Sequence, residues 1–395
     1  MTQLLIAGGG IGGLAAALAG SSAGAQVQLF EHTPEFSEVG AGVQLGPNVT
    51  RVLQAWGLAG ALSDVVAVPD RLQIRSAASG AELGVLRLGE VVHARYGAPY
   101  VTIHRGDLHG LLLTKLKRRG EVALNLDSAV ASFEQDEKTV TLRLHNLREV
   151  RGDLLVGADG GWSRVRQQLL NDGLPQPTGH LAYRALVRQS SLPHNLRSQQ
   201  VTAWLGPRLH MVQYPVRRGE WLNVVAFVHG QVDGDLQNWD HSANAAELQR
   251  HMAATCAPMR DLINTIDHWR LWPLSIRPPM RGAHEHAQWR VALLGDAAHP
   301  MVPYLAQGAG MAIEDAAELG RILAAHALAP GDPVGPEGLR EYAAHRWHRN
   351  ARVQARAIRN GRIFHATGPM RWGRDAAMKL LGESLLDMPW LYGGA

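Results

Sequence analysis

The chain contains 395 residues, of which 46% are hydrophobic and 19% are charged, and its formal net charge is +4. This composition predicts a globular protein of about two domains and excludes a disordered chain. The single cysteine, Cys256, excludes a disulfide framework, a cysteine-based zinc cluster and electron transfer through a cysteine pair. The mild positive charge suits an anionic small substrate, but it does not indicate nucleic-acid binding without a concentrated basic patch.

The segment 1–31 has the pattern of a dinucleotide-binding strand–helix–strand unit. An apolar run at 4–7 predicts a buried strand, residues 14–19 predict a helix, and residues 27–30 predict a second strand. Glycines interrupt this segment and no Lys or Arg precedes its apolar run, so it lacks the pattern of a signal peptide. No other stretch has the length and apolarity of a membrane span, which predicts a cytoplasmic protein without integral membrane association.

The turn between the first strand and the helix fits G-x-G-x-x-G. Gly8 permits the tight turn, Gly10 lets the backbone approach a pyrophosphate, and Gly13 lets the helix pack close to the sheet. The helix N-terminus then offers N–H groups to the phosphates. Glu31 ends the second strand, where a carboxylate can accept both ribose hydroxyls. These residues predict dinucleotide binding and leave FAD and NAD open.

The next part of the chain alternates between loops, strands and one helix. Residues 40–48 are interpreted as a glycine-rich loop that could reach the reactive end of the cofactor. β-Structure is predicted over 71–100 and a helix over 109–118. The further predicted strands lie at 122–126, 129–133, 140–144 and 153–158. The last leads into Asp159-Gly160, and this second strand–turn–helix passage indicates a return to the dinucleotide-binding domain.

Strands dominate the prediction for residues 183–273. In the predicted strand 209–215, period-two alternation places His210, Val212 and Tyr214 on one face. A sheet face that carries an imidazole and a phenol could line a substrate pocket. The alternative is a partly exposed histidine and a tyrosine of the core.

A third glycine-containing turn follows the apolar strand predicted at 291–294. Its Gly-Asp pair at 295–296 precedes a predicted helix over 311–326. The carboxylate could hold a sugar-like chain, and the helix start could stabilise negative charge on a ring.

The C-terminal part predicts helices with arginines spaced by three and four residues, which we interpret as a solvated face or a subunit contact. These arginines are Arg346, Arg349, Arg352, Arg356, Arg359 and Arg362. The chain has 19 histidines, but no pair shows the spacing of a common metal motif, so no metal site is predicted.

Three separated motifs therefore follow one another along the chain. They are Gly8-x-Gly10-x-x-Gly13 with Glu31, Asp159-Gly160 with Ser163 and Arg166, and Gly295-Asp296 with His299-Pro300. This combination resembles the single-component (class A) flavoprotein aromatic hydroxylases over essentially the whole chain. Within that family it is most similar to the 3-hydroxybenzoate 6-hydroxylases and the salicylate hydroxylases.

The resemblance implies FAD in the N-terminal fold, with NADH or NADPH as a co-substrate that has no nucleotide-binding fold of its own. It also implies that the second motif touches both FAD and the nicotinamide cofactor. The implied cofactor-binding residues are Gly8, Gly10, Ile11, Gly13, Glu31, His32, Gly42, Val43, Arg105, Asp159, Asp296, Gly308, Ala309 and Gly310.

The resemblance implies, in addition, a reaction with O2. FAD reduced by NAD(P)H would form a flavin hydroperoxide, whose distal oxygen attacks an electron-rich ring. A phenol reacts better as a phenolate, so a base of near-neutral pKa should accelerate the attack. His210 is the candidate base, since a histidine occupies the matching site in the 3-hydroxybenzoate hydroxylases, and Tyr214 is the candidate for positioning the substrate.

Conversion of 3-hydroxybenzoate to gentisate is the leading expectation for the substrate. Pro303 departs from it, because that family has a glutamine there and proline supplies no amide. Decarboxylating hydroxylation of salicylate to catechol and hydroxylation of a hydroxypyridine acid are the alternatives. A flavin oxidase or dehydrogenase without monooxygenation, and a non-catalytic FAD-binding protein, are hypotheses from other classes.

The expected fold is α/β, with a Rossmann-like FAD-binding domain interleaved with a β-sheet substrate domain and followed by a helical C-terminus. The expected segments are 1–72, 101–180 and 276–335 for FAD binding, 73–100 and 181–275 for the substrate domain, and 336–395 for the helical region. A homodimer is a family expectation only.

Overall fold

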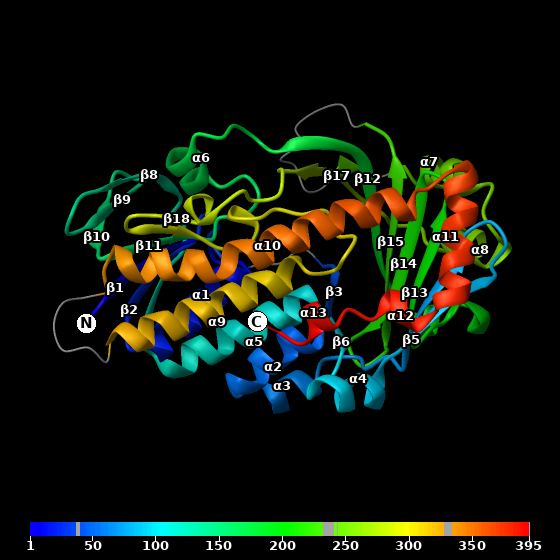
Figure 1. Ribbon diagram of the computed structural model, residues 1–395, viewed down its shortest axis with the longest axis horizontal. Coiled ribbons are helices and arrows are strands. Elements are labelled where there is room, and N and C mark those ends of the chain that lie inside the picture. The colour runs from blue at the N-terminus through cyan, green and yellow to red at the C-terminus, as the bar shows by residue number, and fades with distance from the viewer. Residues whose placement is uncertain (37–39, 232–240, 243, 328–333, 395) are drawn as a thin grey trace. The chain divides into compact units, whose positions relative to one another are not determined.

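The computed structural model describes residues 1–36, 40–231, 241–242, 244–327 and 334–394 (Figure 1). The chain forms two compact units, and each unit is assembled from three separated segments. The first unit comprises Met1–Glu38, Leu108–Gln176 and Ile276–Ala357, and the second comprises Val39–Asp107, Pro177–Ser275 and Ile358–Ala395. The six-segment division expected from the sequence stays a prediction.

The first unit contains a six-stranded sheet of order β18-β19-β11-β1-β2-β7, whose strands are parallel except β18. The strands are β1 (Gln3–Ala7), β2 (Gln26–Phe30), β7 (Val122–Asn125), β11 (Leu154–Gly157), β18 (Ala287–Gln288) and β19 (Val291–Leu293). Every residue of β11 and every residue of β1 except Gln3 is buried, because both faces of this parallel sheet are covered. The strands predicted at 4–7, 27–30 and 153–158 are thereby confirmed.

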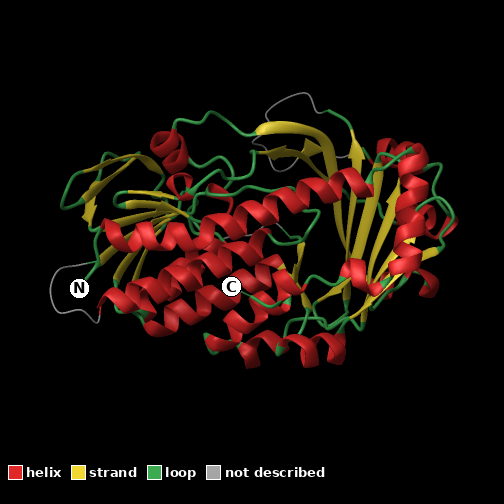
Figure 2. Ribbon diagram, viewed as in Figure 1, coloured by secondary structure: helices red, strands yellow, loops and turns green. Residues whose placement is uncertain are grey.

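Helices flank this sheet in the first unit (Figure 2). They are α1 (Ile11–Ser22), most of α5 (Arg105–Arg119), α6 (Arg164–Leu170), α9 (Gly308–Ala327) and most of α10 (Pro336–Phe364). α1 and α9 approach closely, since a Cβ placed on Gly320 of α9 would lie 2.8 Å from the Cβ of Ala19 in α1. A small antiparallel sheet of β8 (Val130–Gln135), β9 (Val140–Leu144) and β10 (Glu149–Gly152) completes this unit.

The second unit contains an eight-stranded sheet of order β16-β17-β12-β15-β14-β13-β4-β5. Its strands are β4 (Arg71–Ser76), β5 (Glu82–Arg87), β12 (Gln176–Arg188), β13 (Val201–Gly206), β14 (Leu209–Val216), β15 (Trp221–His229), β16 (His241–Ser242) and β17 (Arg270–Ile276). One face of this sheet packs into an apolar core that includes Tyr183, Met211 and Ala226. Because side chains alternate along a strand, the residues between these point to the opposite face.

We call that opposite face the polar face and define it by His180, Arg184, His210, Tyr214 and His229. Its cross-strand pairs follow from the register, in which His180 lies opposite His229 on β15, and His210 lies opposite Phe227 two residues earlier on that strand. The prediction that His210, Val212 and Tyr214 share one face of a strand is confirmed.

Two expectations about the first hundred residues are corrected by the structure. The segment 40–48 is more than a loop, because it contains β3 (Gly42–Leu45), which pairs with β6 (Val101–His104). The predicted β region 71–100 ends in a helix, α4 (Gly89–Tyr96). The other helices of the second unit are α2 (Pro47–Ala55), α3 (Ala59–Ser63), α7 (Ala245–Met252), α8 (Ala257–Thr265), α11 (Gly368–Leu381), α12 (Glu383–Leu386) and α13 (Pro389–Tyr392).

α7 and α8 lie within the stretch that was predicted as strands, and the prediction was wrong there. The pair Leu248 and Met252, spaced by four residues, is buried against the core of the large sheet and indicates a helical period. The α/β fold class with a helical C-terminus is confirmed. Within the described residues, the structure has no helix with both the length and the apolarity that crossing a bilayer would require.

Candidate cofactor and substrate site

The glycine turn after β1 has the geometry of a phosphate-binding loop. Gly8 adopts φ +103°, and a Cβ there would lie 2.4 Å from the carbonyl oxygen of Ala158. A Cβ on Gly13 would lie 1.9 Å from the carbonyl oxygen of Gly8, so only glycine lets α1 start this close to the strand. A Cβ on Gly10 would meet nothing within 4 Å. Gly10 is also the N-cap of α1 without a side-chain cap, which leaves the helix N-terminus accessible to an anion.

Glu31, the predicted ribose acceptor, is buried beside this loop with 7% of its surface exposed. The backbone N–H of Gly9 donates to its Oε2 at 2.6 Å, and the backbone N–H of Thr33 donates to its Oε1 at 2.9 Å. The hydroxyl of Thr33 also donates to Oε1 at 3.0 Å, so Oε1 is fully used and Oε2 keeps one lone pair for a further hydroxyl donor. The neighbouring His32, another predicted cofactor residue, has a largely exposed side chain whose Nδ1 lies 2.7 Å from Oε1 of Glu31.

Two residues beside the glycine loop were missed by sequence reasoning. Nε2 of His109 donates to the carbonyl oxygen of Gly9 at 2.8 Å, and the ring of His109 lies 5.7 Å from that of Phe36. His109 is buried on α5, and its hydrogen bond fixes the backbone of the glycine loop at Gly9. The sequence places His109 in a helix, but nothing in the pattern links that helix to the loop.

The three sequence motifs meet in the first unit. Ala158, which precedes Asp159, is the residue packed against Gly8. Arg166 of the second motif, 4% exposed, donates from Nη1 to the backbone carbonyls of Ala297 and Ala298 in the third motif. Motifs that are more than a hundred residues apart in the sequence thus form one structure.

Asp159 itself stabilises the start of α6. Its Oδ1 accepts a hydrogen bond from the hydroxyl of Ser163 at 2.5 Å, and its Oδ2 accepts from the backbone N–H of Arg164 at 2.8 Å. Desolvation raises the pKa of Asp159, although these donors act in the opposite direction. A direct contact of this carboxylate with a cofactor stays a prediction.

The third motif brings Asp296 to the start of α9. Asp296 is exposed, and a Cβ on Gly308 would lie 3.8 Å from its Oδ1. The predicted residues Gly308, Ala309 and Gly310 form the first turn of α9, which has no acidic residue. This arrangement combines a carboxylate with the positive end of a 20-residue helix, as the sequence predicted.

A buried network of hydrogen bonds and ion pairs fixes the loop of this third motif. Oδ2 of Asp315 accepts from the backbone N–H of Gly295 at 3.1 Å and lies 2.6 Å from Nε2 of His299. Nε of Arg346 donates to Oδ1 of Asp315 at 2.8 Å. Burial alone would raise the pKa of Asp315, but His299 and Arg346 outweigh it and hold that pKa well below its usual range. Arg346 is only 1% exposed, so the interpretation of this arginine as solvated or intersubunit was wrong.

In the second unit, predicted cofactor and catalytic residues lie side by side. A Cβ on Gly42 would lie 2.5 Å from Cε2 of Tyr214, and the backbone N–H of Gly42 donates to Oδ1 of Asn223 at 2.7 Å. Val43 follows on β3, and Arg105 begins α5 with its backbone N–H bonded to the carbonyl of Ala41 at 2.7 Å. Burial raises the pKa of the Tyr214 hydroxyl, which keeps it protonated at neutral pH.

Arg184 is a residue of the polar face that sequence reasoning missed. Its guanidinium lies over the ring of Trp272, 4.5 Å from the centroid, and its Nε is buried without a hydrogen-bond partner among the described residues. Desolvation lowers the pKa of Arg184 to about 10, and Arg105 acts in the same direction, whereas Tyr214 acts in the opposite direction. A shielded cation with no acidic neighbour among these groups is suited to bind an anion.

His210 lies deep in the polar face with 1% of its surface exposed. Its ring stacks on Phe227 at 4.3 Å, and its Nδ1 lies 2.6 Å from Nε2 of His365. Burial, followed by the nearby His365 and His180, lowers the pKa of His210 well below 6.5. The imidazole is therefore neutral and able to accept a proton, but its pKa departs from the near-neutral value that the sequence argument expected for a base.

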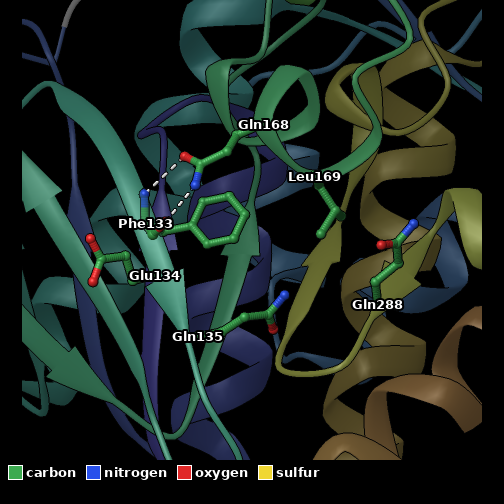
Figure 3. Close-up of a pocket in the computed structure, with 6 residues that line it drawn as sticks. All are labelled: Phe133, Glu134, Gln135, Gln168, Leu169 and Gln288. Carbon is green, nitrogen blue, oxygen red and sulfur yellow. Dashed lines mark hydrogen bonds between the residues drawn. The ribbon is translucent and has the colours of Figure 1, made fainter.

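A separate surface recess of about 460 Å³ lies in the first unit and is lined by Phe133, Glu134, Gln135, Gln168, Leu169 and Gln288 (Figure 3). Both dashed bonds in that view join the side-chain amide of Gln168 to the backbone of Phe133. None of the predicted site residues lines this recess. The recess is therefore not the candidate site, which is defined by the residues described above.

The fold and the three joined motifs define a flavin-binding protein, and comparison with known proteins identifies its class. The chain belongs to the family described as "FAD binding domain", whose model matches residues 1–364. It is a FAD-dependent monooxygenase, with NAD(P)H and O2 as co-substrates.

Individual relatives cover almost the whole chain. It is 37% identical to the 3-hydroxybenzoate 6-hydroxylase of Polaromonas naphthalenivorans, over 99% of this chain and 95% of that protein. It is 35% identical to the 6-hydroxynicotinate 3-monooxygenase of Bordetella bronchiseptica, over 81% and 82% respectively. A solved substrate complex of a salicylate hydroxylase matches with a TM-score of 0.83, at 28% identity over 99% of this chain and 95% of that one.

Proposed function

We propose that this monooxygenase hydroxylates a phenolic aromatic acid, with 3-hydroxybenzoate as substrate and gentisate as product. The observation that carries the proposal is the polar face, which combines a shielded cation, a buried neutral imidazole and a protonated phenol on one sheet surface. An aromatic acid with a phenolic hydroxyl has the complementary groups: a carboxylate for Arg184 and a proton for His210. The 37% identity to a 3-hydroxybenzoate 6-hydroxylase supports this choice of substrate.

The residues of the first unit fit FAD. The glycine turn leaves room at Gly10 for a pyrophosphate, the start of α1 offers N–H donors, and Glu31 is held in position for the ribose. Asp296 and the first turn of α9 would hold another part of the cofactor. FAD, when bound, supplies the chemistry that passes electrons from NAD(P)H to O2 and delivers one oxygen atom as an electrophile.

The residues of the polar face prepare the substrate for that attack. His210, a buried neutral imidazole, is the base that we propose to take the phenolic proton. Loss of that proton raises the electron density of the ring at its ortho and para carbons. Tyr214, whose hydroxyl keeps its proton, would donate a hydrogen bond that orients the substrate, and Arg184 would pair with the carboxylate.

Two related substrates are the alternatives, and each has an observation in its favour. Salicylate, which would give catechol and CO2, is supported by the likeness to the salicylate hydroxylase complex. A hydroxypyridine acid is supported by the 35% identity to the 6-hydroxynicotinate monooxygenase. Pro303 bears on this choice, because proline cannot provide the amide expected for a 3-hydroxybenzoate hydroxylase.

The test is aerobic NADH oxidation by the FAD-loaded protein in the presence of ¹⁸O2, with each of the three acids supplied separately. Gentisate carrying one ¹⁸O atom from 3-hydroxybenzoate is the expected product. Labelled catechol would instead identify salicylate as the substrate, and a labelled dihydroxypyridine would identify the hydroxypyridine acid. Oxidation of substrate without label would contradict monooxygenation on any of them.

Replacing His210 by glutamine should retain FAD and reduce hydroxylation on the order of 100-fold, because the substrate phenol loses its base. Full turnover of that variant would refute the role of His210. A cytoplasmic location and a homodimer are further proposals, and sedimentation analysis of the purified protein tests the latter.

A further inference from the structure

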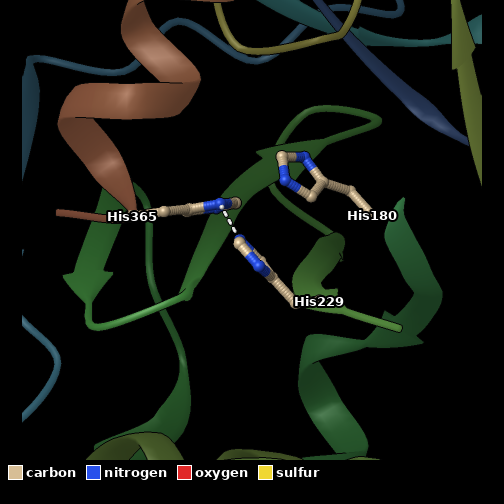
Figure 4. A group of neighbouring side chains, drawn as sticks. All are labelled: His180, His229 and His365. Carbon is tan, nitrogen blue, oxygen red and sulfur yellow. Dashed lines mark hydrogen bonds between the residues drawn. The ribbon is translucent and has the colours of Figure 1, made fainter. Parts of the chain in front are cut away.

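Three histidines of the second unit bring ring nitrogens together where β15 ends (Figure 4). His180 on β12 lies directly opposite His229 on β15, and the centroids of their rings are 4.5 Å apart. His365 follows the last residue of α10, and its Nδ1 lies 3.0 Å from Nε2 of His229. One nitrogen of each ring lies within 4.8 Å of the other two. We call His180, His229 and His365 the histidine cluster.

The spacing of these nitrogens is close to that of a metal site. Zn–N bonds of about 2.0–2.1 Å place two ligand nitrogens of a tetrahedral zinc site about 3.3 Å apart. The 3.0 Å between His229 and His365 is near this value. The distances to His180, at most 4.8 Å, need to shorten by no more than about 1.5 Å, which rotation of side chains supplies. A metal ion would thus replace one hydrogen bond of the histidine cluster by three coordinate bonds.

The imidazoles of the histidine cluster are neutral, which is the form that binds metals such as zinc, copper and nickel. Burial, followed by His229, lowers the pKa of His180 to about 4, and burial lowers the pKa of His365 to about 3. Burial, followed by Arg208, lowers the pKa of His229, and Arg374 acts in the same direction on His365. The two arginines weaken the binding of a cation. However, three protein ligands leave a fourth position for water or an anion, and an anion there would offset this charge.

His365 is held on both its side chain and its backbone. Its Nε2 lies 2.6 Å from Nδ1 of His210. A metal ion on Nδ1 would leave the ring proton of His365 on Nε2, which then donates to His210, and outer partners of this kind orient metal-bound histidines. The backbone carbonyl of His365 accepts from the N–H of Arg208 at 3.1 Å, and its own N–H donates to the carbonyl of Gly361 at 3.1 Å. The ligand from the helix end is therefore positioned before any ion binds.

A metal site also needs a path by which the ion enters. His365 is 7% exposed and His180 is half-buried, whereas His229 is an exposed residue. The histidine cluster is therefore open to solvent on the side of His229.

Another group of potential ligands, in the first unit, lacks both properties. His286, His299 and Asp315 also have ligand atoms within 4.8 Å of one another, but all three are buried. The carboxylate of Asp315 already pairs with the guanidinium of Arg346 and with His299. This contrast favours the histidine cluster of the second unit.

We propose that His180, His229 and His365 bind a divalent transition-metal ion such as zinc, which fastens the end of α10 to the large sheet. His229 and His365 are 136 residues apart, so no local spacing in the sequence marks the site. Because the ligands come together only when the helix and the strands are folded, the ion stabilises the folded second unit. The site acts independently of the substrate and of the proposed base.

The experiment titrates Zn²⁺ by calorimetry into the FAD-loaded protein, which is dialysed against a chelator and carries no histidine tag. We expect one Zn²⁺ per chain at this site, and a higher unfolding temperature when Zn²⁺ is present. X-ray absorption at the zinc edge should show three imidazole ligands.

His229→Ala removes the exposed ligand of the histidine cluster, and its flavin absorbance shows that the variant is folded. Loss of an outer partner weakens metal binding by about 10- to 100-fold, and a direct ligand should matter at least as much, so the Kd for Zn²⁺ should rise at least about 100-fold. The rise in unfolding temperature should disappear with it. His229→Cys supplies a thiolate ligand in place of the imidazole and should keep both effects, which a merely structural role of His229 does not predict.

His251→Ala, at an exposed histidine of α7 outside the histidine cluster, is the matched control and should bind Zn²⁺ as the wild type does. Equal zinc affinity in the wild type and in His229→Ala would refute the site, and so would a zinc spectrum without imidazole ligands. An equal effect of Zn²⁺ on the unfolding temperature of these two proteins would refute the link between α10 and the sheet. None of these readouts depends on which acid the enzyme hydroxylates.

Discussion

Nε2 of His299 and Oδ2 of Asp315 lie 2.6 Å apart, and neither side chain is exposed to solvent. Asp315 is on α9, whereas His299 follows the Gly-Asp motif, so this bond fastens the motif loop to the helix that begins beside it. The carboxylate of Asp315 also accepts hydrogen bonds from the backbone N–H of Gly295 and from the guanidinium of Arg346. One buried aspartate therefore fixes the backbone that presents Asp296.

Replacing Asp315 by asparagine should destabilise the protein by about 3–5 kcal/mol, because it leaves the cation of Arg346 buried with one partner fewer. Urea unfolding measures the change. Glu318→Gln is the matched control on the same helix, since the ion pairs of Glu318 with Arg321 and His345 are half-exposed and worth at most about 1 kcal/mol. Equal effects of the two substitutions would contradict the role of the buried network.

Two alanine substitutions in the glycine turn should have different effects. Gly13→Ala places a methyl group against the carbonyl of Gly8 and should impair both folding and FAD retention. Gly10→Ala meets no protein atom, so the fold should persist while flavin absorbance in the purified protein falls. Gly110→Ala on α5, where a Cβ also has open space, is the neutral control. Full FAD content in Gly10→Ala would show that the pyrophosphate does not pass over this residue.

Arg184→Met should raise KM for the aromatic acid roughly 10- to 100-fold, which corresponds to the loss of a charge-assisted hydrogen bond of about 1.5–3 kcal/mol. Arg184→Lys keeps the charge and should lie between this variant and the wild type. The discriminating measurement uses the corresponding neutral amide as substrate, since the amide has no carboxylate to lose. If acid and amide suffer equally, Arg184 does not recognise the carboxylate.

Acid should destabilise the protein through its buried histidines. Burial lowers the pKa of His286 to about 4, whereas an unfolded histidine titrates near 6.5. As the pH falls below about 6.5, the unfolded chain binds a proton that the folded chain does not, so the free energy of unfolding decreases until about pH 4. Between pH 7.5 and 5 this histidine accounts for about 2 kcal/mol.

The variant His286→Gln isolates that contribution, because glutamine cannot be protonated and can still accept the hydrogen bond that Asn350 gives to Nε2 of His286. Urea unfolding at pH 7.5 and at pH 5 should show a smaller decrease for the variant than for the wild type. The same decrease in both proteins would assign the acid sensitivity to other groups.

The parts of the fold that the sequence predicted well are those with a local signal. The strand, glycine turn and helix at the N-terminus have apolar runs and fixed glycine spacing, and the structure has them at the expected positions. α7 and α8 were missed because they are short and lie between strands, so the general strand pattern of that region outweighed two helical pairs. β3 was read as a loop because its glycine reflects the close approach of Tyr214, a contact that the sequence does not reveal.

The site was predictable where a motif carries the chemistry and unpredictable where distant residues meet. His210 and Tyr214 follow from alternation in one strand, together with the family resemblance. Arg184 has no motif around it, and its shielded position depends on Trp272, which is 88 residues later. His365 lies 155 residues from His210, so only the folded chain shows that the two rings touch.

The first unit's sheet joins strands from opposite ends of the chain: Leu4 of β1 pairs with Leu154 of β11, and Leu155 pairs with Val291 of β19. During synthesis on the ribosome, β1 can pair early with β2, but its other edge must wait for β11, and β11 must in turn wait for β19. The edge of β11 that pairs with β19 must stay unpaired while β12 to β17 of the other unit are being made, which exposes an apolar strand to aggregation. The nucleotide-binding half thus begins the polypeptide but is completed late, after the second unit's large sheet has left the ribosome.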